Sequence, residues 1–225
     1  MKAFVVSPLI VFLAASSLVH GAVISTSLGN TASTLVNGAV QTQALVTTAQ
    51  GVQPAPFSGL CGSDLTMNCS ANWSFSYTVP SGQTITAATL LLGIWDIDSG
   101  ASLNQVASYA LSGGDNLTTL LNAAANAPNA GTGSKNSEYD ILSVTIPSTS
   151  FVQLASGTAN IALALQGPGL GVAATNPPFN GAKLVFSTLN IDTAEVTTTP
   201  EPSFVTLVPM ALGAFAFYRR RRKSC

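Results

Sequence analysis

Charged residues are scarce in this 225-residue sequence: Asp, Glu, Lys and Arg make up 8% of it, against about 25% in average soluble proteins. Arginine is confined to one run near the C-terminus, namely Arg219, Arg220, Arg221 and Arg222. Between Lys2 and that run, Lys135 and Lys183 are the only basic residues. The body of the chain is therefore acidic and has too few basic residues to bind a phosphate backbone, which excludes nucleic acid as a partner.

Histidine is also nearly absent, because His20 is the only one. It lies among the residues that we expect to be removed on export, so the mature chain would contain no imidazole. Ser-His-Asp and Cys-His catalysis need an imidazole base, and many zinc and haem sites need an imidazole ligand. Composition alone therefore excludes these mechanisms and these histidine-ligated sites.

Residues 1–21 have the pattern of a secretory signal peptide. Lys2 provides a short basic region, the stretch over 3–15 is apolar apart from one serine and one proline, and Gly21 is a suitable cleavage position. A membrane anchor and a buried helix are the alternatives. The apolar stretch is short for a membrane span, which favours removal.

The C-terminal segment, residues 196–225, contains three features in a fixed order. These are a Pro-Glu-Pro motif (Pro200, Glu201, Pro202), an apolar stretch over 203–218 and a basic tail over 219–225. The apolar stretch would span about 24 Å as a helix, slightly less than the roughly 30 Å hydrocarbon core of a bilayer. Arginines beside a span stay in the cytoplasm, so the pattern predicts a transmembrane helix with the body of the protein outside that membrane.

This order of motif, short apolar helix and arginine run resembles the PEP-CTERM sorting signal of Gram-negative bacteria. The resemblance implies that an exosortase, a membrane transpeptidase, recognises Pro200, Glu201 and Pro202 and processes the tail. Residues 203–218 would then be a transient inner-membrane anchor, and the four arginines its stop signal. It also implies sorting to the cell surface or extracellular matrix of a polysaccharide-exporting, biofilm-forming organism. An ordinary permanent single-span anchor is the alternative.

Two of the three cysteines lie close together in the sequence. Cys61 and Cys69 flank the loop CGSDLTMNC in a chain predicted to reach an oxidising compartment, which favours a disulfide between them. The alternative is a pair of free thiols, since two neighbouring cysteines alone do not complete a structural zinc site. Cys225 belongs to the basic tail and would leave with it.

Apolar residues in the body alternate or run continuously over short stretches, as in β-strands separated by Gly and Pro turns. Strands are predicted over 73–79, 84–97, 106–111, 139–146, 160–166 and 182–191, a short helix over 115–125, and one helical turn over 150–155. No strand-helix rhythm is present. The pattern favours a mainly β fold, an antiparallel β-sandwich of jelly-roll type, with one or two short helices besides the signal helix and the C-terminal transmembrane helix. We expect the sandwich over 61–195, and a Ser/Thr-rich arm or edge strands over 22–60.

Asp96, Asp98 and Gly100 follow a predicted strand in a D-x-D-x-G pattern. Ca²⁺ takes six to eight oxygen ligands, and spaced aspartates beside a glycine turn can supply several of them. No glutamate completes a calcium loop, so a solvated turn is favoured over a calcium site at Asp96 and Asp98. A melting temperature that does not respond to added calcium would contradict the calcium hypothesis.

Glu138 and Asp140 form a second acidic pair, two residues apart on a predicted strand. Such residues project to the same face, whereas the two acids of a glycoside hydrolase stand on opposite sides of the scissile bond. Carboxylates at the start of a strand are expected to face solvent. This pair therefore does not indicate an enzyme.

Aromatic side chains are the remaining candidates for a binding surface, because exposed rings can stack on sugars. They are Trp73, Tyr77, Trp95 and Tyr109, although their alternation favours the core. The sequence predicts a non-enzymatic exported surface or matrix protein, structural or adhesive, associated with exopolysaccharide. A carbohydrate- or calcium-binding β-sandwich module is the alternative. A third alternative is a glycoside hydrolase using acidic residues, which needs no histidine.

Overall fold

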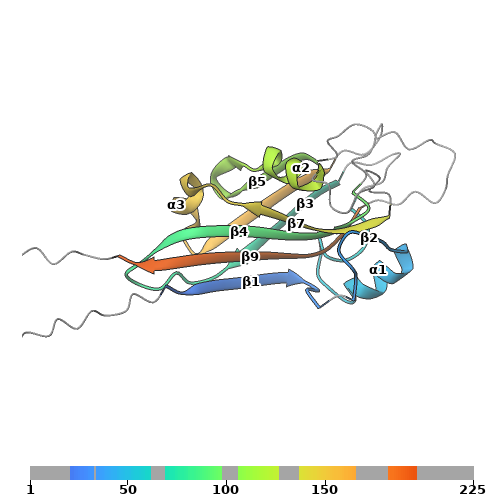
Figure 1. Ribbon diagram of the computed structural model, residues 1–225, viewed down its shortest axis with the longest axis horizontal. Helices are drawn as coiled ribbons and strands as arrows, with labels where there is room; N and C mark the ends of the chain where they lie inside the picture. The colour runs from blue at the N-terminus through green and yellow to red at the C-terminus, as the bar shows by residue number, and fades with distance from the viewer. Residues whose placement is uncertain are drawn as a thin grey trace, which may run out of the picture. The chain divides into compact units, whose positions relative to one another are not determined.

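The computed structural model describes residues 21–32, 34–61, 69–97, 106–126, 137–165 and 182–196. The chain divides into two compact units, Met1–Glu195 and Val196–Cys225, and the helices and strands given below belong to the first. That unit is mainly β, with two antiparallel sheets and few helices (Figure 1). The prediction of a mainly β fold is confirmed at this level.

The two sheets contain five and four strands. The first has the order β1 (Val23–Gly29), β9 (Lys183–Glu195), β4 (Gln83–Trp95), β7 (Glu138–Thr145) and β2 (Ala39–Val40). The second has the order β3 (Cys69–Ser76), β8 (Thr158–Leu165), β5 (Val106–Leu111) and β6 (Asp115–Asn116). Neighbouring strands are antiparallel throughout. The edges are therefore β1 and β2 in the first sheet, and β3 and β6 in the second.

In the described part of the chain, three short α-helices and two 3₁₀ turns connect the strands. They are α1 (Gln43–Gln50), α2 (Thr118–Asn126), α3 (Phe151–Leu154), η1 (Ser112–Gly114) and η2 (Ser148–Ser150). The helix predicted over 115–125 begins later, because Asp115 and Asn116 pair with β5 as strand β6. The Asn116 side-chain oxygen then accepts a hydrogen bond from the Thr118 N–H at 2.9 Å, which satisfies a donor that the first helical turn leaves unpaired.

The inner faces of the two sheets share one hydrophobic core. On β3 and β8 every second side chain is buried, as period-two alternation requires. The core contains Trp73, Phe75, Tyr109, Ile161, Leu163 and Leu165 from the second sheet, and Leu90, Leu92, Ile94, Leu142, Val144, Leu189 and Ile191 from the first. Face-to-face burial from both sheets gives the unit its β-sandwich-like architecture.

Residues 22–60, before the disulfide, form two strands and a helix and are not a loose arm. β1 and β2 are edge strands, as one of the two expectations for residues 22–60 had it, and α1 was not expected. Helix α1 has little apolar periodicity because threonine and glutamine fill much of its sequence. It begins after Thr42, whose side chain accepts a hydrogen bond from the Leu45 N–H.

Helix α1 belongs to a second, smaller apolar cluster on the outer face of the first sheet. The cluster consists of Val46, Trp95, Tyr139, Val185 and Phe186. The Trp95 indole N–H donates to the backbone oxygens of Gln41, at 3.0 Å, and Ser137, at 2.8 Å. The indole therefore ties the residues just before α1 to the start of β7.

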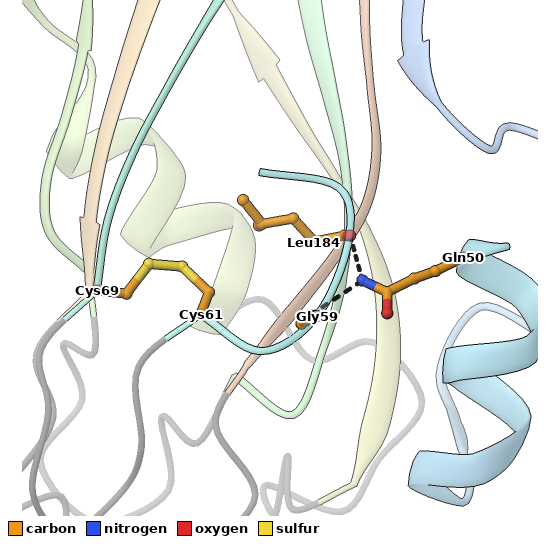
Figure 2. Close-up of a disulfide and its surroundings, with 5 residues drawn as sticks. All are labelled: Gln50, Gly59, Cys61, Cys69 and Leu184. Carbon is orange, nitrogen blue, oxygen red and sulfur yellow. Dashed lines mark hydrogen bonds between the residues drawn. A yellow bond between two sulfur atoms is a disulfide. The ribbon is translucent and has the colours of Figure 1, made fainter. Parts of the chain in front are cut away.

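Gln50 anchors the C-terminal end of α1 to the sheet (Figure 2). Its side chain is 1% exposed, and its amide N–H donates to the backbone oxygens of Leu184, at 2.8 Å, and Gly59, at 3.3 Å. Its amide oxygen accepts from the Lys183 ammonium at 3.2 Å. Burial lowers the pKa of Lys183, because the charged form loses its hydration. The Gln50 amide thus replaces part of the water that this ammonium loses.

Cys61 and Cys69 form a disulfide, with their Cα atoms 5.1 Å apart (Figure 2). Both residues are buried in the core. Cys69 is the first residue of β3, and the Cys61 N–H donates to the Ala182 oxygen at 2.6 Å, just before β9 begins. The disulfide therefore joins one end of the second sheet to the first.

Candidate functional site

Three acidic residues lie where β4 ends beside the start of β7. Asp140 pairs with Ile94, Tyr139 pairs with Trp95, and the Asp96 N–H donates to the Glu138 oxygen at 2.8 Å. Asp96 and Asp140 are 0% exposed and Glu138 is 4% exposed. The expectations of a solvated turn at Asp96 and of solvent-facing Glu138 and Asp140 are therefore wrong. The strand ends that carry them are covered by tertiary packing, which strand periodicity alone does not reveal.

Asp96 connects the end of β4 to the start of β7. It adopts a left-handed backbone conformation, with φ of 60°, which aspartate tolerates better than most residues. Its side-chain oxygen Oδ1 accepts the Ser137 N–H, so the carboxylate holds together the end of β4 and the start of β7. Asp96, Glu138 and Asp140 each have further interactions with neighbouring groups, and none is an unpaired charge.

The calcium hypothesis depends on Asp98 as well as Asp96, and Asp98 lies outside the described residues. In the described part of the chain, no three His, Cys, Asp or Glu side chains form a group that could hold a metal ion. The calcium site at Asp96 and Asp98 stays a prediction. Glu138 and Asp140 lie on one strand, face the same side and are buried, so they do not flank an open cleft as two hydrolytic acids would.

The aromatic candidates for sugar stacking lie mainly in the interior. Trp73 is 7% exposed, and Trp95 and Tyr109 are 0% exposed. Trp73 packs edge-on against Phe57, with ring centroids 5.6 Å apart. Tyr77 is partly buried, and its hydroxyl donates to the Leu154 oxygen at 2.7 Å. These four rings are held by the fold and do not form an exposed stacking platform.

Tyr77 and Tyr109 differ in the hydrogen bonding of their hydroxyl groups, so substitutions at the two positions can be compared. Among the described residues the Tyr109 hydroxyl has no hydrogen-bond partner, whereas that of Tyr77 has one. We expect Tyr109→Phe to leave the melting temperature at pH 7 unchanged or higher, because a buried unpaired hydroxyl costs free energy. Tyr77→Phe should lower it, since the Leu154 oxygen loses one of its two donors and keeps only the Gly157 N–H.

The same pair predicts the alkaline stability of the protein. Burial raises the pKa of Tyr77 to about 12 and raises that of Tyr109 further. Unfolded tyrosine ionises near pH 10, so the folded state loses stability as the pH rises above 10 toward the folded pKa values. Tyr109→Phe should reduce this loss in urea titrations at pH 9 to 11.5. An equal alkaline loss in wild type and variant would contradict the assignment.

A groove lies on the outer face of the second sheet. It has a volume of about 470 Å³, and its lining includes Asn72, Ser74, Ala110, Ser112, Asn160 and Ala162. The lining side chains from β3 and β8 project outward because their strand neighbours project into the core. None of the described residues that line the groove is charged.

Asn160 is at the centre of the hydrogen bonds in this groove. The Ser74 hydroxyl donates to its side-chain oxygen at 2.5 Å, and its backbone N–H donates to the Ser112 hydroxyl at 2.6 Å. The bond from Ser74 uses the amide oxygen of Asn160 as an acceptor, and an amide also carries an N–H₂ group that can donate. A surface of amides, hydroxyls and methyl groups can exchange hydrogen bonds with a neutral, hydroxyl-rich ligand.

Sequence reasoning did not identify this groove. The alternation of serine with aromatic residues indicated the outward-facing positions of β3. It did not reveal that Ser74 and Ser112, from distant parts of the chain, both hydrogen-bond to Asn160, which lies between them.

The sequence-predicted sorting features lie outside the described residues. This holds for Pro200, Glu201 and Pro202, for the stretch over 203–218 and for the basic tail over 219–225, and also for residues 1–20 of the predicted signal peptide. Within the described residues, no helix is long and apolar enough to cross a membrane. No protein-family model matches the chain, and no curated protein matches it either.

Proposed function

We propose that this chain is an exported, non-enzymatic protein of the cell surface or extracellular matrix, with a structural or adhesive role alongside exopolysaccharide. The observation that carries the proposal is the order of Pro-Glu-Pro motif, apolar stretch and arginine run at the C-terminus, together with a signal-peptide pattern at the N-terminus. An exosortase-type enzyme of a Gram-negative organism would process the tail, and 203–218 would hold the chain in the inner membrane until then. The buried Cys61–Cys69 disulfide fits an oxidising destination.

Mass spectrometry of the mature protein from its own organism tests the sorting proposal. We expect the N-terminus to lie near residue 22 and the C-terminus near the Pro-Glu-Pro motif, with the arginine run missing. Replacing Glu201 by alanine should keep the tail on the protein, while Glu195→Ala, outside the motif, should not. A mature chain that retains Arg219 to Arg222 would replace sorting with permanent anchoring.

We further infer that the sandwich is a jelly roll. Along the chain, β1 lies in the first sheet, β3 in the second, β4 in the first, β5 and β6 in the second, β7 in the first, β8 in the second and β9 in the first. A chain that crosses repeatedly between two facing sheets is characteristic of this fold, and β2 is then an added edge strand. Jelly rolls serve many unrelated functions, so this fold supports a scaffold role without naming a ligand.

The groove on the second sheet favours a carbohydrate-binding role as the alternative. Its lining is uncharged, and the Asn72 and Asn160 amides and the Ser74 and Ser112 hydroxyls match the donors and acceptors of a neutral polysaccharide. It lacks an exposed aromatic ring, and stacking contributes about 1 kcal/mol or more where it occurs. Binding by one copy would therefore be weak, and many copies on one polymer would supply avidity.

Binding to exopolysaccharide from the same organism tests this alternative. We expect Asn72→Ala with Asn160→Ala to reduce retention on immobilised polysaccharide at least fivefold, because both amide groups are lost from the groove. Ser143→Ala, exposed on the other sheet, is the matched control and should bind as wild type. Equal retention of all three proteins would remove the groove as the binding site. Melting temperatures establish that the variants are folded.

A further inference from the structure

The edge strands on the two sides of the sandwich differ in length. On one side, the edge strands are β2 and β6, each of two residues. On the other side, they are β1, of seven residues, and β3, of eight. β1 and β3 belong to different sheets and contact one another. β1 runs along the lower margin of the first sheet in Figure 1.

On the β2 side of the first sheet, the outward-facing backbone groups of β7 form hydrogen bonds with the segment around β2. The Asn37 side-chain oxygen accepts the Ile141 N–H at 2.7 Å, and the Gly38 N–H donates to the Tyr139 oxygen at 2.8 Å. The Gln41 N–H donates to the Ser137 oxygen at 2.7 Å. β7 therefore has its outer edge covered by the segment that contains β2.

The second sheet is covered in the same way on this side. The Leu117 N–H donates to the Tyr109 oxygen at 2.7 Å, and the Thr118 hydroxyl accepts the Tyr109 N–H at 3.0 Å. The Asn122 side chain donates to the Val106 oxygen at 3.2 Å. The outward-facing backbone of β5 is thus occupied by β6 and α2.

Among the described residues, nothing covers β1 in this way. Ala22 and Asn30 hydrogen-bond to Thr193 and Val185 of the neighbouring chain segment, so in the antiparallel ladder the backbone groups of Val23, Ser25, Ser27 and Gly29 point away from β9. The described residues supply no partner for these groups. In β3, the Tyr77 N–H donates to the Gly157 oxygen, so the odd-numbered residues of this strand face β8. The backbone groups that point away from β8 are therefore those of Ser70, Asn72, Ser74 and Ser76.

Neither edge carries the features that normally prevent pairing. Proteins protect exposed edges with lysine, proline, bulges or very short strands. β1 reads VISTSLG and β3 reads CSANWSFS, without a charged residue or a proline, and neither ladder contains a register shift. Neither strand therefore places a charged side chain of its own against a second copy.

We propose that the β1 edge, with β3 beside it, is a self-association surface on which a second copy of this chain pairs strand to strand. An antiparallel edge is self-complementary, because its donors and acceptors exchange under a two-fold axis. One axis perpendicular to the sheets pairs β1 with the partner's β1 and sets β3 beside its counterpart. This inference does not depend on the export pathway or on polysaccharide binding.

The size of the surface predicts how strong the pairing is. Seven antiparallel residues extend about 24 Å, and two sheets about 10 Å apart with their side chains are roughly 20 Å deep, so each copy buries about 500 Å². The total of about 1,000 Å² lies at the low end of specific interfaces. We therefore expect a reversible dimer whose population rises with concentration.

Sedimentation of the full chain in a mild detergent, over a hundredfold range of concentration, tests the proposal. Wild type should form a dimer, and Ser25→Lys should raise its dissociation constant at least tenfold by placing a charge on the free edge. Ala87→Lys, exposed on the central strand β4 of the same sheet, makes the same change in charge and should dimerise as wild type. Equal melting temperatures establish that the variants are folded, and a wild type that stays monomeric would overturn the proposal.

Cysteine crosslinking gives a second readout of the same geometry. In a Cys225→Ser background, Ser25→Cys or Ser27→Cys should yield an oxidised covalent dimer, whereas Ala87→Cys should not. Crosslinking of equal yield at all three positions would indicate random encounters and would overturn the proposal. A ladder of larger species would contradict the closed two-fold pairing, because β1-to-β3 pairing between copies adds subunits without limit.

Discussion

Replacing Gly93 by alanine should lower the free energy of unfolding by about 2 to 3 kcal/mol, the upper part of the range for overpacking a core. Gly93 lies on β4 opposite Phe186 of β9, at the register shift between these two strands. A Cβ atom there would overlap the Phe186 ring and lie 2.7 Å from the Tyr139 hydroxyl oxygen. Both rings belong to the apolar cluster under α1, so neither has open space to move into.

A second substitution separates this steric cause from strand propensity. In the Gly93→Ala background, Phe186→Leu removes the ring atoms nearest the new methyl group and should restore part of the lost stability. Phe186→Leu alone should be destabilising, so the two changes should be strongly non-additive in a double-mutant cycle. Urea unfolding of the four proteins measures the coupling. Additive losses would show that the ring does not set the requirement for glycine.

Removing the disulfide is the second change with a large expected effect. Replacing Cys61 and Cys69 together by alanine should cost about 2 to 3 kcal/mol, the chain-entropy value for a loop closed across a separation of eight residues. The loss also loosens the Cys61–Ala182 contact, through which the segment before β3 reaches the start of β9. Unfolding midpoints of oxidised wild type and the double variant measure this difference.

The third cysteine provides the control for this experiment. Cys225→Ser leaves the 61–69 loop intact and should not change the unfolding midpoint. Wild type treated with reductant should approach the double variant, because both lose the same crosslink. A reduced protein as stable as the oxidised one would show that packing of the two buried cysteines, and not the covalent bond, holds this end of the sandwich.

Most strands could be predicted from the sequence because local periodicity records which face of a strand is apolar. The alternation of Trp73 and Phe75 with serines corresponds to β3, and Ile161, Leu163 and Leu165 correspond to the buried face of β8. Helix α1 could not be predicted in this way. Its polar sequence needs little apolar surface, because Val46 and the Gln50 amide make the contacts that hold it to the sheet.

The candidate groove could not be predicted from the sequence for a different reason. Ser74 and Asn160 are 86 residues apart, and Ser112 and Asn160 are 48 apart, so only strand pairing brings their polar groups together. Each residue alone is an ordinary outward-facing position on a strand. The burial of Asp96, Glu138 and Asp140 has the same origin, since it depends on what packs over the ends of β4 and β7.

The sequence by itself determined the scarcity of charge, the absence of histidine outside the predicted signal peptide, the candidate sorting signal at the C-terminus and the positions of most strands. These depend on composition and on the order of neighbouring residues. Only the tertiary structure decided which carboxylates are buried, which polar side chains share a groove, and which edges are covered. Those properties depend on pairing between distant segments: Asn37 covers β7 and α2 covers β5, while the long edges of β1 and β3 have no such partner among the described residues.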